Sequence, residues 1–125
     1  MATDPDAKII TDAEIVLESE LPTPRLSLFE AQEWINHISF AEDIDPPKLY
    51  LLPISQRYDA LAVADEHVIV VRTAQPSKLT LLHEMAHFLG AMNHGAEFRQ
   101  TYIDLLRRHV SQSHALLLAA TVKKH

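Results

Sequence analysis

The apolar residues of this chain recur at helical spacing in several stretches, and the clearest stretch runs from Leu79 to Gly90. Four positions, each three or four residues from the next, predict a helix with one buried face. These positions are Leu79, Leu82, Ala86 and Leu89. Ser77 is a candidate N-cap, and Gly90 is a candidate left-handed stop at the C-terminal end.

Similar patterns predict three further helices. Ser27 and Glu30 form a capping-box signature at the start of a helix that we expect to end near Ala41, before a Pro-Pro pair. A third helix is expected after Gly95, with Phe98, Tyr102, Leu105 and Leu106 on its buried side. The apolar stretch from Ala115 to Val122 is expected to be helical as well.

Three short runs rich in β-branched or aromatic residues predict strands at 48–52, 60–64 and 67–72. The last two flank Asp65-Glu66 and predict a hairpin. The expected order is helix, three strands, then helices, so the fold class is α+β with a small, mainly antiparallel sheet.

The acidic residues are concentrated at the N-terminus. Residues 1–45 carry a formal charge of −9 and residues 46–125 carry +3. We expect residues 1–24 to form an acidic, partly mobile arm, with a short strand or docked segment around Ile9 to Leu17, and residues 25–125 to form the domain. No concentrated basic face is expected, which argues against a specific nucleic-acid partner.

The composition limits the chemistry and the location. The chain has no cysteine, so a metal site must use histidine and carboxylate ligands. No run of eighteen apolar residues is present, so no membrane partner is expected, and the N-terminus lacks a signal peptide's apolar core. A cytoplasmic location is the default expectation.

The predicted helix at 79–90 carries a candidate metal motif. His83 and His87 are four residues apart, so both rings project from one face, one turn apart, and can bind one tetrahedral ion. Glu84 lies beside that ion without binding it and can take a proton from metal-bound water. The simpler alternative is a chance pattern of solubilising residues in a helix.

A catalytic zinc site needs a third protein ligand. His94 is the first candidate, because the chain can reverse after Gly90 and return to the metal there. Glu97 is the second candidate; if His94 binds, Glu97 can instead support a ligand or stabilise the N-terminus of the next helix.

Tyr102 has two interpretations. Its hydroxyl can face the metal and stabilise an oxyanion, which would make it catalytic. Alternatively, it is a core tyrosine whose hydroxyl is satisfied locally.

The block His83-Glu84-Met85-Ala86-His87, followed by His94-Gly95-Ala96-Glu97-Phe98, resembles the zincin superfamily. Within it, the chain is similar to small bacterial and phage-encoded metallohydrolases and to SprT-type metalloproteases. The resemblance implies a minimal zincin-like fold, Zn²⁺ held by His83, His87 and His94, and Glu84 as general base. It also implies that an edge strand before the motif helix, at Val68–Arg72, binds a peptide or protein substrate.

The expected function is therefore a zinc metallohydrolase, most simply a metallopeptidase. One alternative is hydrolysis of a different amide or ester. The other is a non-catalytic zinc-binding or partner-interaction domain, recognisable by a fourth protein ligand such as Glu97 or His109. Because few residues follow His94, we expect a shallow cleft, or one completed by a partner, a homodimer mate or the N-terminal arm.

Overall fold

A computed structural model describes residue 4 and residues 6–123 of the chain. The ends of the expected arm and domain, at residues 1–3, 5 and 124–125, lie outside the described residues. The elements in chain order are α1 (Asp6–Glu20), α2 (Leu28–Ala41), β1 (Lys48–Leu51), β2 (Ala60–Val63), the 3-10 turn η1 (Ala64–Glu66), β3 (Val68–Val71), α3 (Lys78–Leu89), α4 (Ala96–His109) and α5 (Gln112–Lys123).

The α+β class is confirmed, but the sheet is mixed instead of mainly antiparallel. The strand order is β1-β3-β2; β3 pairs in parallel with β1 and antiparallel with β2. The expected hairpin is the β2–β3 pair, and its connection is longer than two residues because η1 intervenes before His67, which adopts a left-handed conformation (φ 54°).

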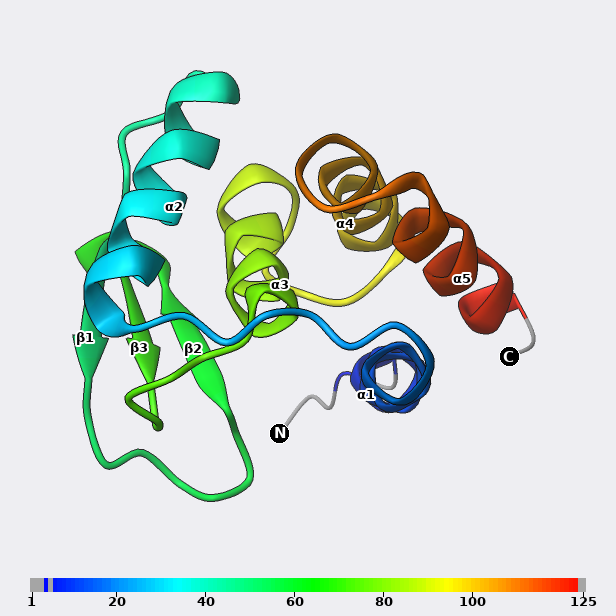
Figure 1. The fold of residues 1–125 in the computed structure, drawn as a ribbon, viewed down its shortest axis with the longest axis horizontal. Helices are drawn as coiled ribbons and strands as arrows, with labels where there is room; N and C mark the ends of the chain where they lie inside the picture. The colour runs from blue at the N-terminus through cyan, green and yellow to red at the C-terminus, as the bar shows by residue number, and fades with distance from the viewer. Residues whose placement is uncertain (1–3, 5, 124–125) are drawn as a thin grey trace.

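The expectation that the strand at Val68–Arg72 is an edge strand is wrong. β3 is the central strand, with β1 on one side and β2 on the other (Figure 1). On the β1 side, the Val71 carbonyl accepts from the Leu52 N–H. On the β2 side, the Arg72 N–H donates to the Asp59 carbonyl. Backbone groups on both sides of β3 are thus occupied, so an added peptide strand cannot pair there.

Helix α3 occupies the middle of the molecule (Figure 1). It packs against β2 and α2 on one side and against α4 on the other. Leu81, Leu82, Met85 and Ala86 are fully buried, so this helix is held on several faces and offers a rigid support for a site.

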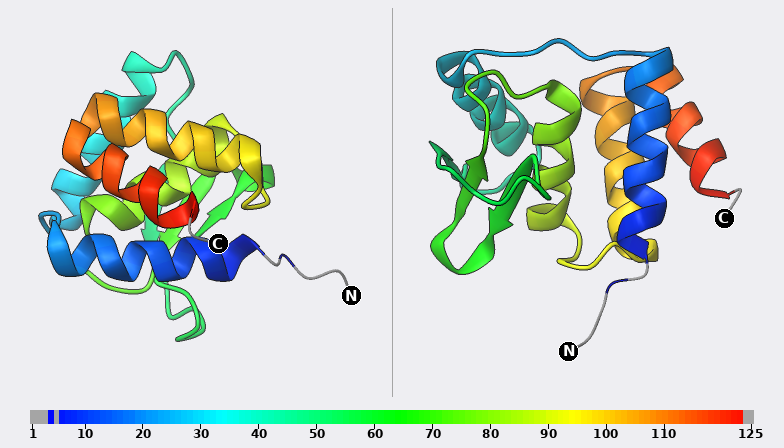
Figure 2. Two further views of the ribbon diagram at one scale, coloured as in Figure 1. Left: turned by 90° about the vertical axis from the view of Figure 1, so that its right-hand side faces the viewer. Right: turned by 90° about the horizontal axis from the view of Figure 1, so that it is seen from below.

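Of the two expectations for the N-terminal segment, the strand is wrong and the docked segment is observed, in the form of a helix. α1 spans Asp6–Glu20 and lies alongside α5 (Figure 2). Ile10, Ala13 and Leu17 have no exposed surface and belong to the same hydrophobic cluster as α3, α4 and α5. Their spacing of three and four residues is the helical pattern that places them on one face.

Two of the predicted helix starts are confirmed. The Ser27 hydroxyl accepts from the Glu30 N–H, and the Glu30 carboxylate accepts from the Ser27 N–H. Ser77 caps α3 by accepting from the Thr80 N–H.

Gly90 ends α3, but not in a left-handed conformation (φ −116°, ψ −106°). Glycine is required there for space, since a Cβ atom would lie 2.7 Å from the Thr101 Oγ1 atom of α4.

Glu42 joins the C-terminal ends of α2 and α4. Arg108 donates two hydrogen bonds to its carboxylate, at 2.9 and 2.7 Å, and His109 Nε2 lies 2.9 Å from it. Burial raises the pKa of Glu42, but these hydrogen bonds lower it by more than burial raises it. The pKa therefore falls below its ordinary value. The ionised form is therefore favoured in the folded protein.

We predict that Glu42→Gln lowers the free energy of unfolding by about 1 kcal/mol at pH 7. Because the folded-state pKa is depressed, this stabilisation is present above the unfolded-state pKa and is lost as pH falls through the folded-state value. Urea titrations at pH 7 and pH 3 measure the difference, with exposed Glu33→Gln as control. A difference at pH 3 as large as that at pH 7 would contradict the assignment.

Candidate metal centre

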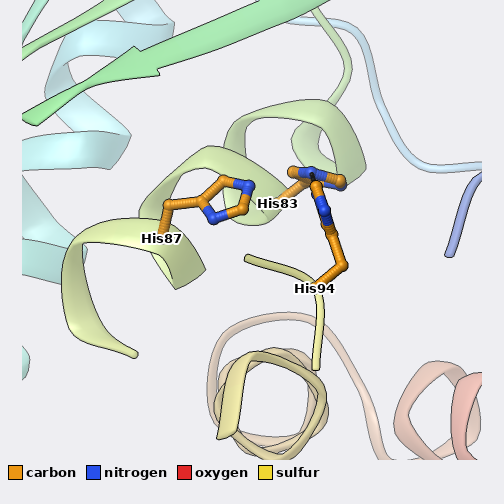
Figure 3. A group of neighbouring side chains, drawn as sticks. All are labelled: His83, His87 and His94. Atoms are coloured by element: carbon orange, nitrogen blue, oxygen red, sulfur yellow. Dashed lines mark hydrogen bonds between the residues drawn. The ribbon is translucent and has the colours of Figure 1, made fainter. Parts of the chain in front are cut away.

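Three histidine rings converge next to α3 (Figure 3). His83 and His87 project from α3, and His94 reaches them from the loop that follows it. One nitrogen from each ring lies within 4.8 Å of the other two, and the Nε2 atoms of His83 and His94 are 3.2 Å apart. Two ligands of one tetrahedral zinc ion are separated by about 3.3 Å at ordinary zinc–nitrogen distances. The predicted grouping of the three histidines is present.

Each ring has its other nitrogen held by an oxygen acceptor. His83 Nδ1 lies 2.6 Å from the Glu14 carboxylate and His94 Nδ1 lies 2.7 Å from the Asp4 carboxylate, while His87 Nδ1 lies 2.9 Å from the Ala91 carbonyl. Carboxylates and carbonyls only accept, so Nδ1 carries the hydrogen in all three rings. The Nε2 atoms are therefore the ones available to a metal, and this arrangement is typical of histidine ligands.

The three rings rest on one aromatic side chain. Phe98 of α4 is fully buried, and its ring centroid lies 5.1, 4.4 and 4.8 Å from those of His83, His87 and His94. These contacts restrict the rotation of the three rings and keep water away from the side of the cluster that faces Phe98.

The protonation of His83 and His87 differs because their neighbours differ. Burial lowers the pKa of His83, but the Glu14 carboxylate more than offsets this and raises it to about 9. Burial lowers the pKa of His87 to about 4, and the two neighbouring rings add to the effect. A cation binding at Nε2 of His83 would displace a proton, whereas His87 is already neutral.

Glu84 is buried beside the histidines. Glu84 is only 6% exposed, and burial is the main reason that the pKa of its carboxyl group rises to about 7. The His83 ring and the backbone of Ala62 in β2 offset part of this rise. The predicted base therefore lies between the histidine cluster and the sheet edge.

A cleft of about 210 Å³ opens onto this group. One wall is α1, the opposite wall is the loop at 57–59 with the start of β2, and the floor is α3 with His94. Among the candidates for completing a shallow cleft, the N-terminal segment therefore provides one wall from within the same chain.

Tyr102 does not face the cleft. It has no exposed surface, and its hydroxyl donates to Glu14 at 2.6 Å, with the Leu79 carbonyl at 3.4 Å. Burial and the Glu14 carboxylate raise its pKa well above the ordinary value. This geometry matches the second interpretation, a core tyrosine whose hydroxyl is satisfied locally. Tyr102 holds the Glu14 carboxylate, which in turn holds His83.

Neither expected fourth ligand is in the cluster. Glu97 is exposed and does not belong to the histidine group, and His109 lies 2.9 Å from Glu42 at the other end of α4. Within the described residues, the group has three histidines that could hold a metal ion.

The two carboxylates of the N-terminal segment that hold the histidines were not predicted from the sequence. Glu14 lies 69 positions from His83, and Asp4 lies 90 positions from His94, whose backbone N–H also donates to it at 3.0 Å. One signal was available: Glu14 follows Ile10 by four residues and precedes Leu17 by three, which puts an acid on the buried face of a helix.

Comparison of the chain with known protein families, with curated proteins and with solved structures finds no significant match. The arrangement of the site therefore has to carry the functional argument. Within the described residues, no helix has both the length and the apolar character needed to cross a membrane.

We predict that Glu14→Gln lowers the affinity for Zn²⁺ by about 10- to 100-fold, because the uncharged amide holds His83 Nδ1–H less strongly. Competition with a chromophoric chelator measures the change. Asp12→Asn on the same helix is the matched control, since Asp12 pairs only with Lys8 at the surface. Equal affinities for the two variants would show that Glu14 does not support the ligand.

Proposed function

We propose that this chain is a zinc-dependent hydrolase that cleaves peptide bonds. The observation that carries the proposal is the grouping of three imidazoles beside a cleft that His83, His94 and the buried Glu84 line. Three imidazoles with their Nδ1 atoms held are the donor set that zinc prefers in catalytic sites. Zinc bound there would supply a Lewis acid for the substrate carbonyl and for water.

Glu84 is the group that moves the proton. Its carboxylate takes a proton from the attacking water as the oxygen–carbon bond forms, and delivers it to the amide nitrogen as the carbon–nitrogen bond breaks. Glu84 lines the same cleft as His83 and His94.

The substrate strand is assigned to β2 in place of β3. The hydrogen bond from Arg72 N–H to the Asp59 carbonyl fixes the register of the pair. Since inward and outward backbone groups alternate along a strand, Ala60 and Ala62 direct theirs away from β3. No strand pairs with that edge within the described residues, so an extended peptide can add there and lie across the cleft.

The non-catalytic alternative is less well supported. A structural zinc site is closed by four protein ligands, whereas Glu97 and His109, the expected candidates for the fourth, are both directed elsewhere. The cleft lined by His83, Glu84 and His94 also leaves room beside the ligands for a substrate.

We predict that the purified protein binds one zinc ion and that Glu84→Gln retains the ion but lowers kcat by about 10²- to 10⁴-fold. The measurement is hydrolysis of a quenched-fluorescence peptide library, with the zinc content of each sample determined in parallel. Asp65→Asn, in the turn between β2 and β3, is the control. Hydrolysis by the Gln variant at the wild-type rate, or a chain that takes up no zinc, would rule out this function.

A further inference from the structure

Arg57 differs from the other arginines of this chain in the hydrogen bonding of its guanidinium. The other arginines bond through the guanidinium to a carbonyl or carboxylate: Arg25 to Gln75, Arg72 to Asp59, Arg99 to Asp6, Arg107 to Asp104 and Arg108 to Glu42. For Arg57, the described residues provide a bond only to its backbone N–H, which donates to the Ser55 hydroxyl at 3.2 Å. Its guanidinium has no carboxylate partner among them.

The loop around Arg57 is nevertheless held in place. Arg72 donates to the Tyr58 carbonyl at 3.0 Å and to the Asp59 carboxylate at 3.2 Å. On the other side, the Tyr58 N–H donates to the Ser55 carbonyl at 3.1 Å. Arg72 therefore engages the carboxylate nearest in sequence to Arg57, and the Arg57 guanidinium stays free to bind a ligand.

Arg57 lines the same cleft as the histidine cluster and Glu84. Three carboxylates line it as well: Glu14 is hydrogen-bonded to His83 and Tyr102, Asp59 is hydrogen-bonded to Arg72, and Glu84 is buried. No lysine and no other arginine is among its lining residues in the described chain. The cleft thus has a single guanidinium at its wall, and none of the three carboxylates is paired with it within the described residues.

We propose that Arg57 is a specificity-determining residue that binds a carboxylate of the substrate close to the bond that is cleaved. The proposal rests on the hydrolase function and narrows its substrate class to peptides with an acidic group near the scissile bond. A guanidinium binds a carboxylate through two parallel hydrogen bonds, which fixes orientation as well as charge. In a cleft below the usual size of a ligand pocket, about 300–1,000 Å³, one such anchor has a large influence on selection.

The carboxylate can come from an acidic side chain or from a free C-terminus, and the experiment separates the two. The probes are two pairs of dye-labelled, alanine-rich hexapeptides: one pair compares Glu with Gln at a central position, and the other compares a C-terminal carboxylate with an amide. Dissociation constants are measured by fluorescence anisotropy on the zinc-loaded Glu84→Gln protein, where turnover is suppressed.

We expect the acidic member of one pair to bind about tenfold more tightly than its neutral partner, which corresponds to about 1.4 kcal/mol. Adding Arg57→Gln should reduce that ratio to about one, Arg57→Lys should keep part of it, and Arg107→Gln, at a distant surface, should leave it unchanged. The ratio should also fall as salt is added. The pair that shows the preference identifies the source of the carboxylate.

The inference fails if neither pair shows a preference, if no peptide binds, or if the preference survives Arg57→Gln. Because binding is measured without turnover, this outcome is independent of the test of catalysis. A charge preference without hydrolysis by the wild-type chain would keep the anion site and remove the hydrolase. Glu84-dependent hydrolysis without a charge preference would keep the hydrolase and remove the anion site.

Discussion

The structure depends on holding three imidazole rings so that their Nε2 atoms face one point. Two adjacent turns of α3 place His83 and His87, but a helix alone does not fix how the rings rotate. The acceptors at Nδ1 supply that constraint, and two of them come from the N-terminal segment as Glu14 and Asp4. α1 packs into the core through Ile10, Ala13 and Leu17, and this packing places Glu14 beside His83.

The parts of the molecule set by local patterns could be predicted from the sequence. The capped start of α3 at Ser77 and the grouping of His83 with His87 follow from residue spacing alone. The parts set by contacts between distant segments could not. The parallel pairing that makes β3 the central strand depends on where β1 lies, and the role of Tyr102 depends on Glu14, which lies 88 positions away. Propensity and period carry no information about such pairings.

The elements around the cleft each have two roles, one in the packing of the fold and one in lining the cleft. β2 is one edge of the sheet, and its first residue, Ala60, also lines the cleft. α1 covers α5 through Ile10 and Leu17, while its other side forms a wall of the cleft and supports His83. The remaining wall is a short loop fixed by Arg72. A change in any of these elements is therefore expected to affect packing and chemistry together, so substitutions that keep side-chain shape are the informative ones.

The most direct test of the central claim is a crystal structure of the zinc-loaded protein with anomalous differences recorded at the zinc edge. We predict one peak bonded to the Nε2 atoms of His83, His87 and His94 at about 2.0–2.1 Å, with the Glu84 carboxylate outside bonding distance. A peak elsewhere, or an ion closed off by a fourth protein ligand, would contradict it.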